Sequence, residues 1–280
     1  MSSPATGKDP PTKDNKEDYF TAIPTEMFAN VASMLDDKDQ LALRQTCHFA
    51  KVVVQTAFNK RYVECLLIKI QPSREDELEA ILGLLTTDDF AVAVKKVKLV
   101  VLGPSCGSFK YYTKTFSKIL SKLPVQLDVE IDGSNSIGLD DTEVPAAADG
   151  FLQALAQSSQ QVSSLKISYI FLGTTRLRAL FAAQKPYLRS IDLQMLVLQY
   201  GSWGGLLRTF VDGELDSFYF FHLEVATEPE EQVLASRILT DRSIKNKQGE
   251  EIGNIKLGLG MAQLKGPKCV RKGLKKIFKE

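Results

Sequence analysis

The fold is decided by three similar stretches of the chain: LKISYIFLG at 165–173, LRSIDLQMLVL at 188–198 and LDSFYFFHLEV at 215–225. Each is a short run of mostly aliphatic or aromatic residues, which is typical of a β-strand. VKLVVLG at 97–103 and QLDVEID at 126–132 have the same character. We therefore expect a β-strand in each of these stretches.

Helix-like segments separate the expected strands, because their apolar residues recur three and four positions apart. These segments are 109–123, 147–159, 174–184 and 202–213. Thr174 and Ser202 favour the cap at the start of a helix, and Gly213 favours the position just past its end. Strands and helices therefore alternate along this part of the chain.

The spacing of the strands suggests a repeat. Most of the intervals between successive strand starts fall within the roughly 20 to 29 residues of a leucine-rich repeat, in which a strand is followed by a helix. The interval between the strands at 126–132 and 165–173 is longer. The stretch 188–198 comes closest to such a repeat, with its apolar residues at Leu188, Ile191, Leu193 and Leu198. The repeats are degenerate, and an ordinary sheet of βαβ units fits the same alternation.

The N-terminal part of the chain, from about residue 20 to 62, has a helical pattern instead. Met27, Phe28, Val31, Met34 and Leu35 recur at helical spacing,. A second helix is expected to start at Asp37, where Asp37 and Gln40 resemble a capping box. With a further break near Cys47, the segment is predicted to be a compact bundle of short helices.

Within this bundle, IPTEMFANVASMLDDKDQLALRQTCHF at 23–49 resembles an F-box, as found in many fungal proteins. The residues that carry the resemblance are Ile23, Pro24, Glu26, Met27, Phe28, Val31, Leu35, Asp39, Leu41 and Cys47. The sequence departs from the family where Gln40 replaces a Leu, Thr46 replaces a Val and Phe49 stands nearest to the usual Trp. The resemblance is confined to this N-terminal segment and covers only a small part of the chain.

The resemblance implies a partner. F-box helices bury apolar side chains against a Skp-family adaptor, which links them to a cullin-based (SCF-type) ubiquitin ligase. By position, the adaptor-binding residues here would be Ile23, Pro24, Met27, Phe28, Val31, Leu35, Leu41 and Cys47. The repeats would then hold a protein substrate. The alternative is a non-catalytic scaffold or interaction module of the same fold with no ubiquitin link.

Physical reasoning leads to a similar expectation. A helical unit of roughly 40 residues lies at the margin of independent stability. Its apolar residues exceed what such a small core can hide, so part of its surface is expected to pack on something else. The surface that covers these residues is either a partner chain or the repeats that follow. In the second case the helical unit would cap the repeats.

The expected fold class is therefore α+β: a small N-terminal helical F-box-like bundle followed by an irregular α/β leucine-rich-repeat-like solenoid. The expected boundaries are a disordered tail at 1–18, the F-box-like domain at 19–62, the repeat-like domain at 66–226 and a C-terminal extension with a basic tail at 227–280.

Composition argues against an enzyme. The chain has 2 His, and its 4 Cys (Cys47, Cys65, Cys106 and Cys269) are far apart, so neither a zinc site nor neutral-pH acid/base chemistry is indicated,. We expect no cofactor, no metal and no catalytic residues. The formal net charge of +1 makes nucleic acid an unlikely partner,. The polar N-terminus and the shortness of the apolar stretches predict no membrane partner and a cytoplasmic and/or nuclear location.

Weaker signals are expected to be structural. His48 and His222 are interpreted as packed or hydrogen-bonded, and Trp203 as packing at a repeat junction or as a recognition anchor. The acidic cluster around Asp140 and the segment around Cys106 are interpreted as loops. The basic residues near the C-terminus are interpreted as a solvated tail, in preference to a nucleic-acid or membrane site. They are Lys265, Lys268, Arg271, Lys272, Lys275, Lys276 and Lys279.

Overall fold

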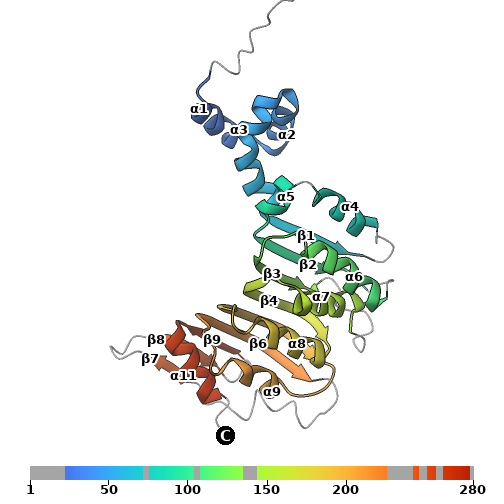
Figure 1. Cartoon of the computed structure of the whole chain (residues 1–280). Helices are drawn as coiled ribbons and strands as arrows, with labels where there is room; N and C mark the ends of the chain where they lie inside the picture. Colours follow the sequence, from blue (N-terminus) through green and yellow to red (C-terminus); the bar gives the residue numbers. More distant parts are fainter. Residues whose placement is uncertain are drawn as a thin grey trace, which may run out of the picture. The chain divides into compact units, whose positions relative to one another are not determined.

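The computed structural model describes residues 23–71, 76–86, 88–103, 108–134, 144–225, 242–245, 251–256 and 261–277. Contacts between residues divide the chain into two compact units, Met1–Tyr62 and Val63–Glu280. The tail expected at 1–18 lies outside the described residues. Each unit is considered by itself (Figure 1).

The first unit consists of three short helices, α1 (Thr25–Met34), α2 (Asp37–Thr46) and α3 (His48–Phe58), followed by a π-helical segment, η2 (Asn59–Val63). The helices stop where the sequence breaks the pattern: Cys47 is extended, with φ −159° and ψ 166°, and separates α2 from α3. Asp36, rather than Asp37, caps α2, because its side chain accepts a hydrogen bond from the backbone N–H of Asp39 at 2.9 Å. The N-cap is therefore displaced by one residue from the predicted position.

The core of the first unit is thin. Its buried apolar residues are Phe28, Ala32, Ala50 and Val54. Phe28 meets Phe49 edge-on, with ring centroids 5.5 Å apart. Gln40 does not take part in a capping box; it is buried, and its Nε2 donates to the carbonyl of Ala32 at 3.0 Å. A buried amide thus joins α2 to α1 where the F-box family often has Leu.

The second unit is built on one sheet with the strand order β1-β2-β3-β4-β5-β6-β9-β8-β7 in the described residues. The first six strands are parallel and follow one another in chain order, and β7, β8 and β9 pair antiparallel. The bounds are β1 (Cys65–Ile70), β2 (Lys96–Val101), β3 (Gln126–Asp132), β4 (Gln161–Leu172), β5 (Ser190–Leu198), β6 (Ser217–Val225), β7 (Arg242–Lys245), β8 (Glu251–Lys256) and β9 (Met261–Lys265).

Helices connect the parallel strands and lie side by side along the sheet (Figure 1). They are α4 (Asp76–Leu84), α5 (Asp88–Ala93), α6 (Phe109–Leu120), α7 (Ala146–Gln157), α8 (Thr174–Gln184) and α9 (Trp203–Leu207) with the 3₁₀ turn η4 (Arg208–Phe210). A further helix, α11 (Pro267–Ile277), follows β9. Helices α6, α7, α8 and α9 pack on one another in that order. Each strand and the helix after it therefore repeat the same arrangement.

The main core lies between these helices and the sheet. Buried aromatic rings from successive helices meet edge-on: Phe116 and Phe151 have centroids 5.1 Å apart, and Phe181 and Phe210 have centroids 4.8 Å apart. The strands send every second side chain into this layer, as the period of a β-strand requires. Their alternate side chains lie on the opposite face of the sheet.

The structure confirms the coarse prediction of a helical unit followed by a mixed α/β unit, and QLDVEID at 126–132 coincides with β3. Strands β1 and β9 were not predicted, and two expectations were wrong in detail. Thr174 is not the cap of α8, since Gly173 holds that position and Thr174 Oγ1 donates to the carbonyl of Tyr200. Gly213 follows η4 without adopting a positive φ.

The basic C-terminal segment also differs from the solvated tail that was expected. Pro267–Ile277 forms α11, which contacts β9 and β6. Its apolar residues Cys269, Val270 and Leu274 are buried. Burying Cys269, Val270 and Leu274 on one face explains why a strongly basic sequence forms an ordered helix.

Candidate functional site

Helix α1 and the segment just before it expose a set of large apolar side chains, which we call the apolar row: Ile23, Met27, Val31 and Met34. Their side chains are 41%, 60%, 60% and 84% exposed, respectively. Met27, Val31 and Met34 are spaced four and three residues apart, which places them on one side of the helix, and Ile23 lies two residues before its start,. Phe28 and Ala32 point the other way, into the core. Helix α1 is therefore apolar on two faces, and only one of them is used in folding its own unit.

The predicted adaptor-binding residues divide into two groups. Ile23, Pro24, Met27, Val31 and Leu41 are exposed, and Leu41 on α2 is 45% exposed.

The remaining three are less accessible. Phe28 is only 6% exposed, because its ring packs on Phe49, so its prediction as a docking residue is corrected to a core role. Leu35 and Cys47 are half-buried. The sulfur of Cys47 accepts from the backbone N–H of Ala50 at 3.4 Å, at the start of α3.

A second candidate surface is the face of the sheet opposite the core, which we call the open face. Its central row runs through Leu67, Lys98, Glu130, Lys166, Asp192, Tyr219 and Gln263, which are register partners on β1, β2, β3, β4, β5, β6 and β9. Charges of opposite sign therefore alternate along four neighbouring strands. Sequence reasoning missed this row, because it depends on pairing between distant segments.

Three lysines surround one buried carboxylate in that row. Lys98 Nζ donates to Glu130 Oε1 at 2.9 Å, Lys96 donates to the other carboxylate oxygen, and Lys166 Nζ lies 3.9 Å from Oε1. The side chain of Glu130 is only 9% exposed. Burial alone would raise its pKa, but the hydrogen bonds and charges of Lys96 and Lys98 lower the pKa to about 2. This cluster is consequently an ionised, internally satisfied part of the surface.

The open face also carries a repeated backbone irregularity. Tyr169, Met195 and His222 have positive φ angles of 55°, 51° and 53°. The register places them at the same position in β4, β5 and β6. Such a conformation is unfavourable for residues with large side chains. Because it recurs in three strands, it changes the direction of a tyrosine, a methionine and a histidine side chain relative to a regular strand. β-Bulges next to active sites have the same effect.

The neighbouring strand accommodates this irregularity with a glycine. Gly133 N–H donates to the carbonyl of Ser168 at 2.9 Å. A Cβ at this position would lie 2.2 Å from the carbonyl oxygen of Tyr169. Only glycine allows the end of β3 to approach the irregular part of β4 this closely.

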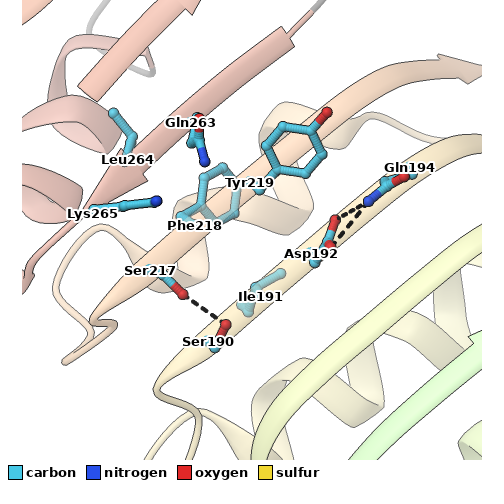
Figure 2. Close-up of a pocket in the computed structure, with 10 residues that line it drawn as sticks. All are labelled: Ser190, Ile191, Asp192, Gln194, Ser217, Phe218, Tyr219, Gln263, Leu264 and Lys265. Atoms are coloured by element: carbon cyan, nitrogen blue, oxygen red, sulfur yellow. Dashed lines mark hydrogen bonds between the residues drawn. The ribbon is translucent and has the colours of Figure 1, made fainter. Parts of the chain in front are cut away.

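A hollow of about 320 Å³ opens where β5, β6 and β9 meet. Figure 2 shows Asp192 and Gln194 on one strand, Tyr219 on the next and Lys265 on the third. Ser190 and Ser217 share a hydrogen bond of 2.6 Å at one end of the hollow. The lining is mostly polar, so the hollow suits a polar or charged side chain of a partner better than an apolar ligand.

The other residues that the sequence singled out are located as follows. Trp203 is buried, and its Nε1 donates to the carbonyl of Glu224 at 2.8 Å, which confirms the prediction of a packing role. His222 is exposed and its Nε2 lies 2.5 Å from Glu224 Oε1. His48 is exposed at the start of α3. Asp140 and Cys106 lie outside the described residues.

Two kinds of site are absent from the described part of the chain. It contains no group of three or more His, Cys, Asp or Glu placed to hold a metal ion. No helix in it is both long and apolar enough to cross a bilayer.

The chain was also compared with known proteins. Neither a protein-family model nor a curated protein sequence matches it. Two surfaces of the described residues stand out as candidate binding sites: the apolar row and the open face.

Proposed function

We propose that the protein is a non-catalytic substrate-recognition subunit of a cullin-based ubiquitin ligase. The apolar row would bind a Skp-family adaptor, and the open face would bind a protein substrate. By holding both partners on one chain, the protein would raise the effective concentration of the substrate near the ligase. The chemistry would then be carried out by the partners.

The exposure of the apolar row is the observation that carries this proposal. Met27 and Val31 are each 60% exposed although they lie on a helix whose other face is fully packed. Burying one such side chain stabilises a complex by about 1–2 kcal/mol, so a row of four supplies a useful part of an interface. Ile23, Met27 and Val31 coincide with positions at which the F-box resemblance places adaptor contacts, and Met34 extends the row beyond those positions.

The topology of the second unit supports an α/β solenoid, the architecture of leucine-rich repeats. Six parallel strands follow one another in chain order without a reversal, whereas doubly wound sheets change direction at a switch point,. Leu165 pairs with Ile191, and Ile191 with Phe218, so these two successive repeats are nearly equal in length. Solenoids of this kind bind other proteins through their extended sheet surface.

The experiment is an affinity purification of the full chain from cells, followed by mass spectrometry. The proposal expects a Skp-family adaptor and a cullin among the recovered proteins. A variant with Met27→Glu and Val31→Glu should lose both, because charged groups would be buried at the interface. Val125→Glu serves as the control, since Val125 is similarly exposed (55%) but precedes β3 in the second unit.

Leu35 is a poorer choice for this test, because it is half-buried and a charge there would also disturb the fold of the bundle. Recovery of other proteins through an intact apolar row, with neither adaptor nor cullin, would favour the scaffold without a ubiquitin link.

A further inference from the structure

Asp192 presents a charged acceptor to the hollow on the open face. Both of its carboxylate oxygens accept from Gln194 Nε2, at 2.8 and 3.0 Å, which fixes the orientation of the group (Figure 2). A carboxylate offers about four acceptor sites, so this contact leaves capacity for further donors. The nearest lysine in register, Lys166, is directed to Glu130 at 3.9 Å. Across the described residues, no lysine or arginine nitrogen comes within ion-pair distance of Asp192.

The side chain of a tyrosine neighbours this carboxylate on the next strand. Tyr219 is its register partner on β6, and Tyr169, 38% exposed, belongs to the repeated irregularity on β4. The pKa of Tyr219 is raised by burial and, to a smaller degree, by the charges of Asp192 and Tyr169. The hydroxyl of Tyr219 also lies 3.6 Å from the sulfur of Met261. Aromatic faces beside a carboxylate are the usual surroundings of a bound organic cation.

We infer that the part of the hollow between Asp192 and Tyr219 binds an arginine or lysine side chain of the protein substrate. The inference rests on the proposed role of the open face in substrate binding. It specifies that this face selects substrates with a basic side chain. The cation would pair with the carboxylate and lie against the tyrosine ring. A solvent-facing acceptor that already has a fixed orientation can form a charge-assisted hydrogen bond without reorganising.

The one lysine that lines the hollow does not compete for this position. Lys265 is the register partner of Ser217, in the neighbouring row of the open face, and is two strands away from β5. Ser217 in turn bonds to Ser190, in the same row as Lys265. The two ends of the hollow therefore differ in charge: Lys265 lies at one end and Asp192 at the other. The arginine or lysine of the substrate would bind at the Asp192 end.

The test is a titration of the full chain, labelled with ¹³C at its methionine methyl groups, followed by NMR. The chain has 5 methionines. Met195 and Met261 lie on the open face and report binding there, while Met27 and Met34 on α1 are internal controls. The probe is N-acetyl-arginine-N-methylamide, and N-acetyl-glutamate-N-methylamide is the probe of opposite charge.

The inference expects saturable shifts of Met261 and Met195 with the arginine probe and none with the glutamate probe. Asp192→Asn, which keeps the shape and removes the charge, should weaken binding about tenfold, the loss of one charge-assisted hydrogen bond. Asp128→Asn should bind as the unmodified chain does, because Asp128 lies on β3 and bonds to Ser163.

Absence of saturable shifts in the unmodified chain would overturn the inference, as would equal binding by Asp192→Asn or a preference for the glutamate probe. The fluorescence of Trp203, which is buried in the second unit, shows in each case that this unit of the variant is folded. Failure here leaves adaptor binding through the apolar row unaffected, so the inference and the proposed function can fail separately.

Discussion

Replacing Glu130 with glutamine is expected to remove a pH-dependent part of the stability of the second unit. Glu130 is 9% exposed and is bonded to Lys96 and Lys98. Its pKa falls from 4.5 to about 2 on folding. Lowering a pKa by this amount corresponds to about 3 kcal/mol, and since the lysines are partly solvated we expect about 1–3 kcal/mol.

The direction of the pH effect follows from the lowered pKa. The folded protein binds the Glu130 proton less readily than the unfolded chain, so the stabilisation is complete above pH 4.5 and is lost as the pH falls toward about 2,. Glu130→Gln should therefore be less stable than the unmodified protein at pH 7. The difference between the two proteins should shrink at pH 3.

Urea unfolding followed by tryptophan fluorescence measures this directly. The chain has 1 Trp, and Trp203 is buried in the second unit, so the signal reports that unit alone. Asp128→Asn is the control, because Asp128 is exposed and contacts no lysine in the described residues. A stability difference between Glu130→Gln and the unmodified protein that is the same at pH 7 and pH 3 would refute the reasoning.

Three further outcomes are expected. Gly133→Ala should destabilise the second unit by about 1–3 kcal/mol in the same urea assay, because its Cβ would lie 2.2 Å from the carbonyl of Tyr169; an unchanged midpoint would contradict the close approach of the strands,. His222→Gly should stabilise that unit by up to about 1 kcal/mol, since glycine tolerates a φ of 53° better than histidine does,. A loss of stability would show that the contacts of the histidine side chain contribute more than its backbone strain costs. Phe28→Ala should lower the stability of the helical unit by about 3 kcal/mol, measured by circular dichroism, because Phe28 is in its core,. Met27→Ala, on the exposed face of α1, should change that stability by less than about 0.5 kcal/mol,. Equal effects of the two substitutions would refute the assignment of the two faces of α1.

Local patterns in the sequence predict the elements that carry their own signal. Strand β3 and helix α8 coincide with their predicted ranges because alternating and helical periodicity are properties of a single segment,. Strand β9 is a short run, MAQLK, and is held by pairing with β6, which lies much earlier in the sequence. No local pattern distinguishes it from a loop.

The candidate sites differ in the same way. Three members of the apolar row, Ile23, Met27 and Val31, could be proposed from the sequence as docking residues, because the apolar residues of this segment outnumber the core positions available to them. Phe28 was misjudged, because helical spacing alone does not say which of two apolar faces is buried. On the open face, Asp192 is a candidate binding residue only because Tyr219 lies beside it. The register between β5 and β6 sets that pairing, and the sequence does not reveal it. The positive φ angles of Tyr169 and Met195 have no counterpart in residue type, since neither residue favours them.

Titrating the purified full chain with a purified Skp-family adaptor, followed by calorimetry, tests the central claim most directly. The account predicts saturable binding that is abolished by Met27→Glu combined with Val31→Glu and retained by Val125→Glu. A folded chain that binds no adaptor, or one that binds equally well with both charges in the apolar row, would contradict it.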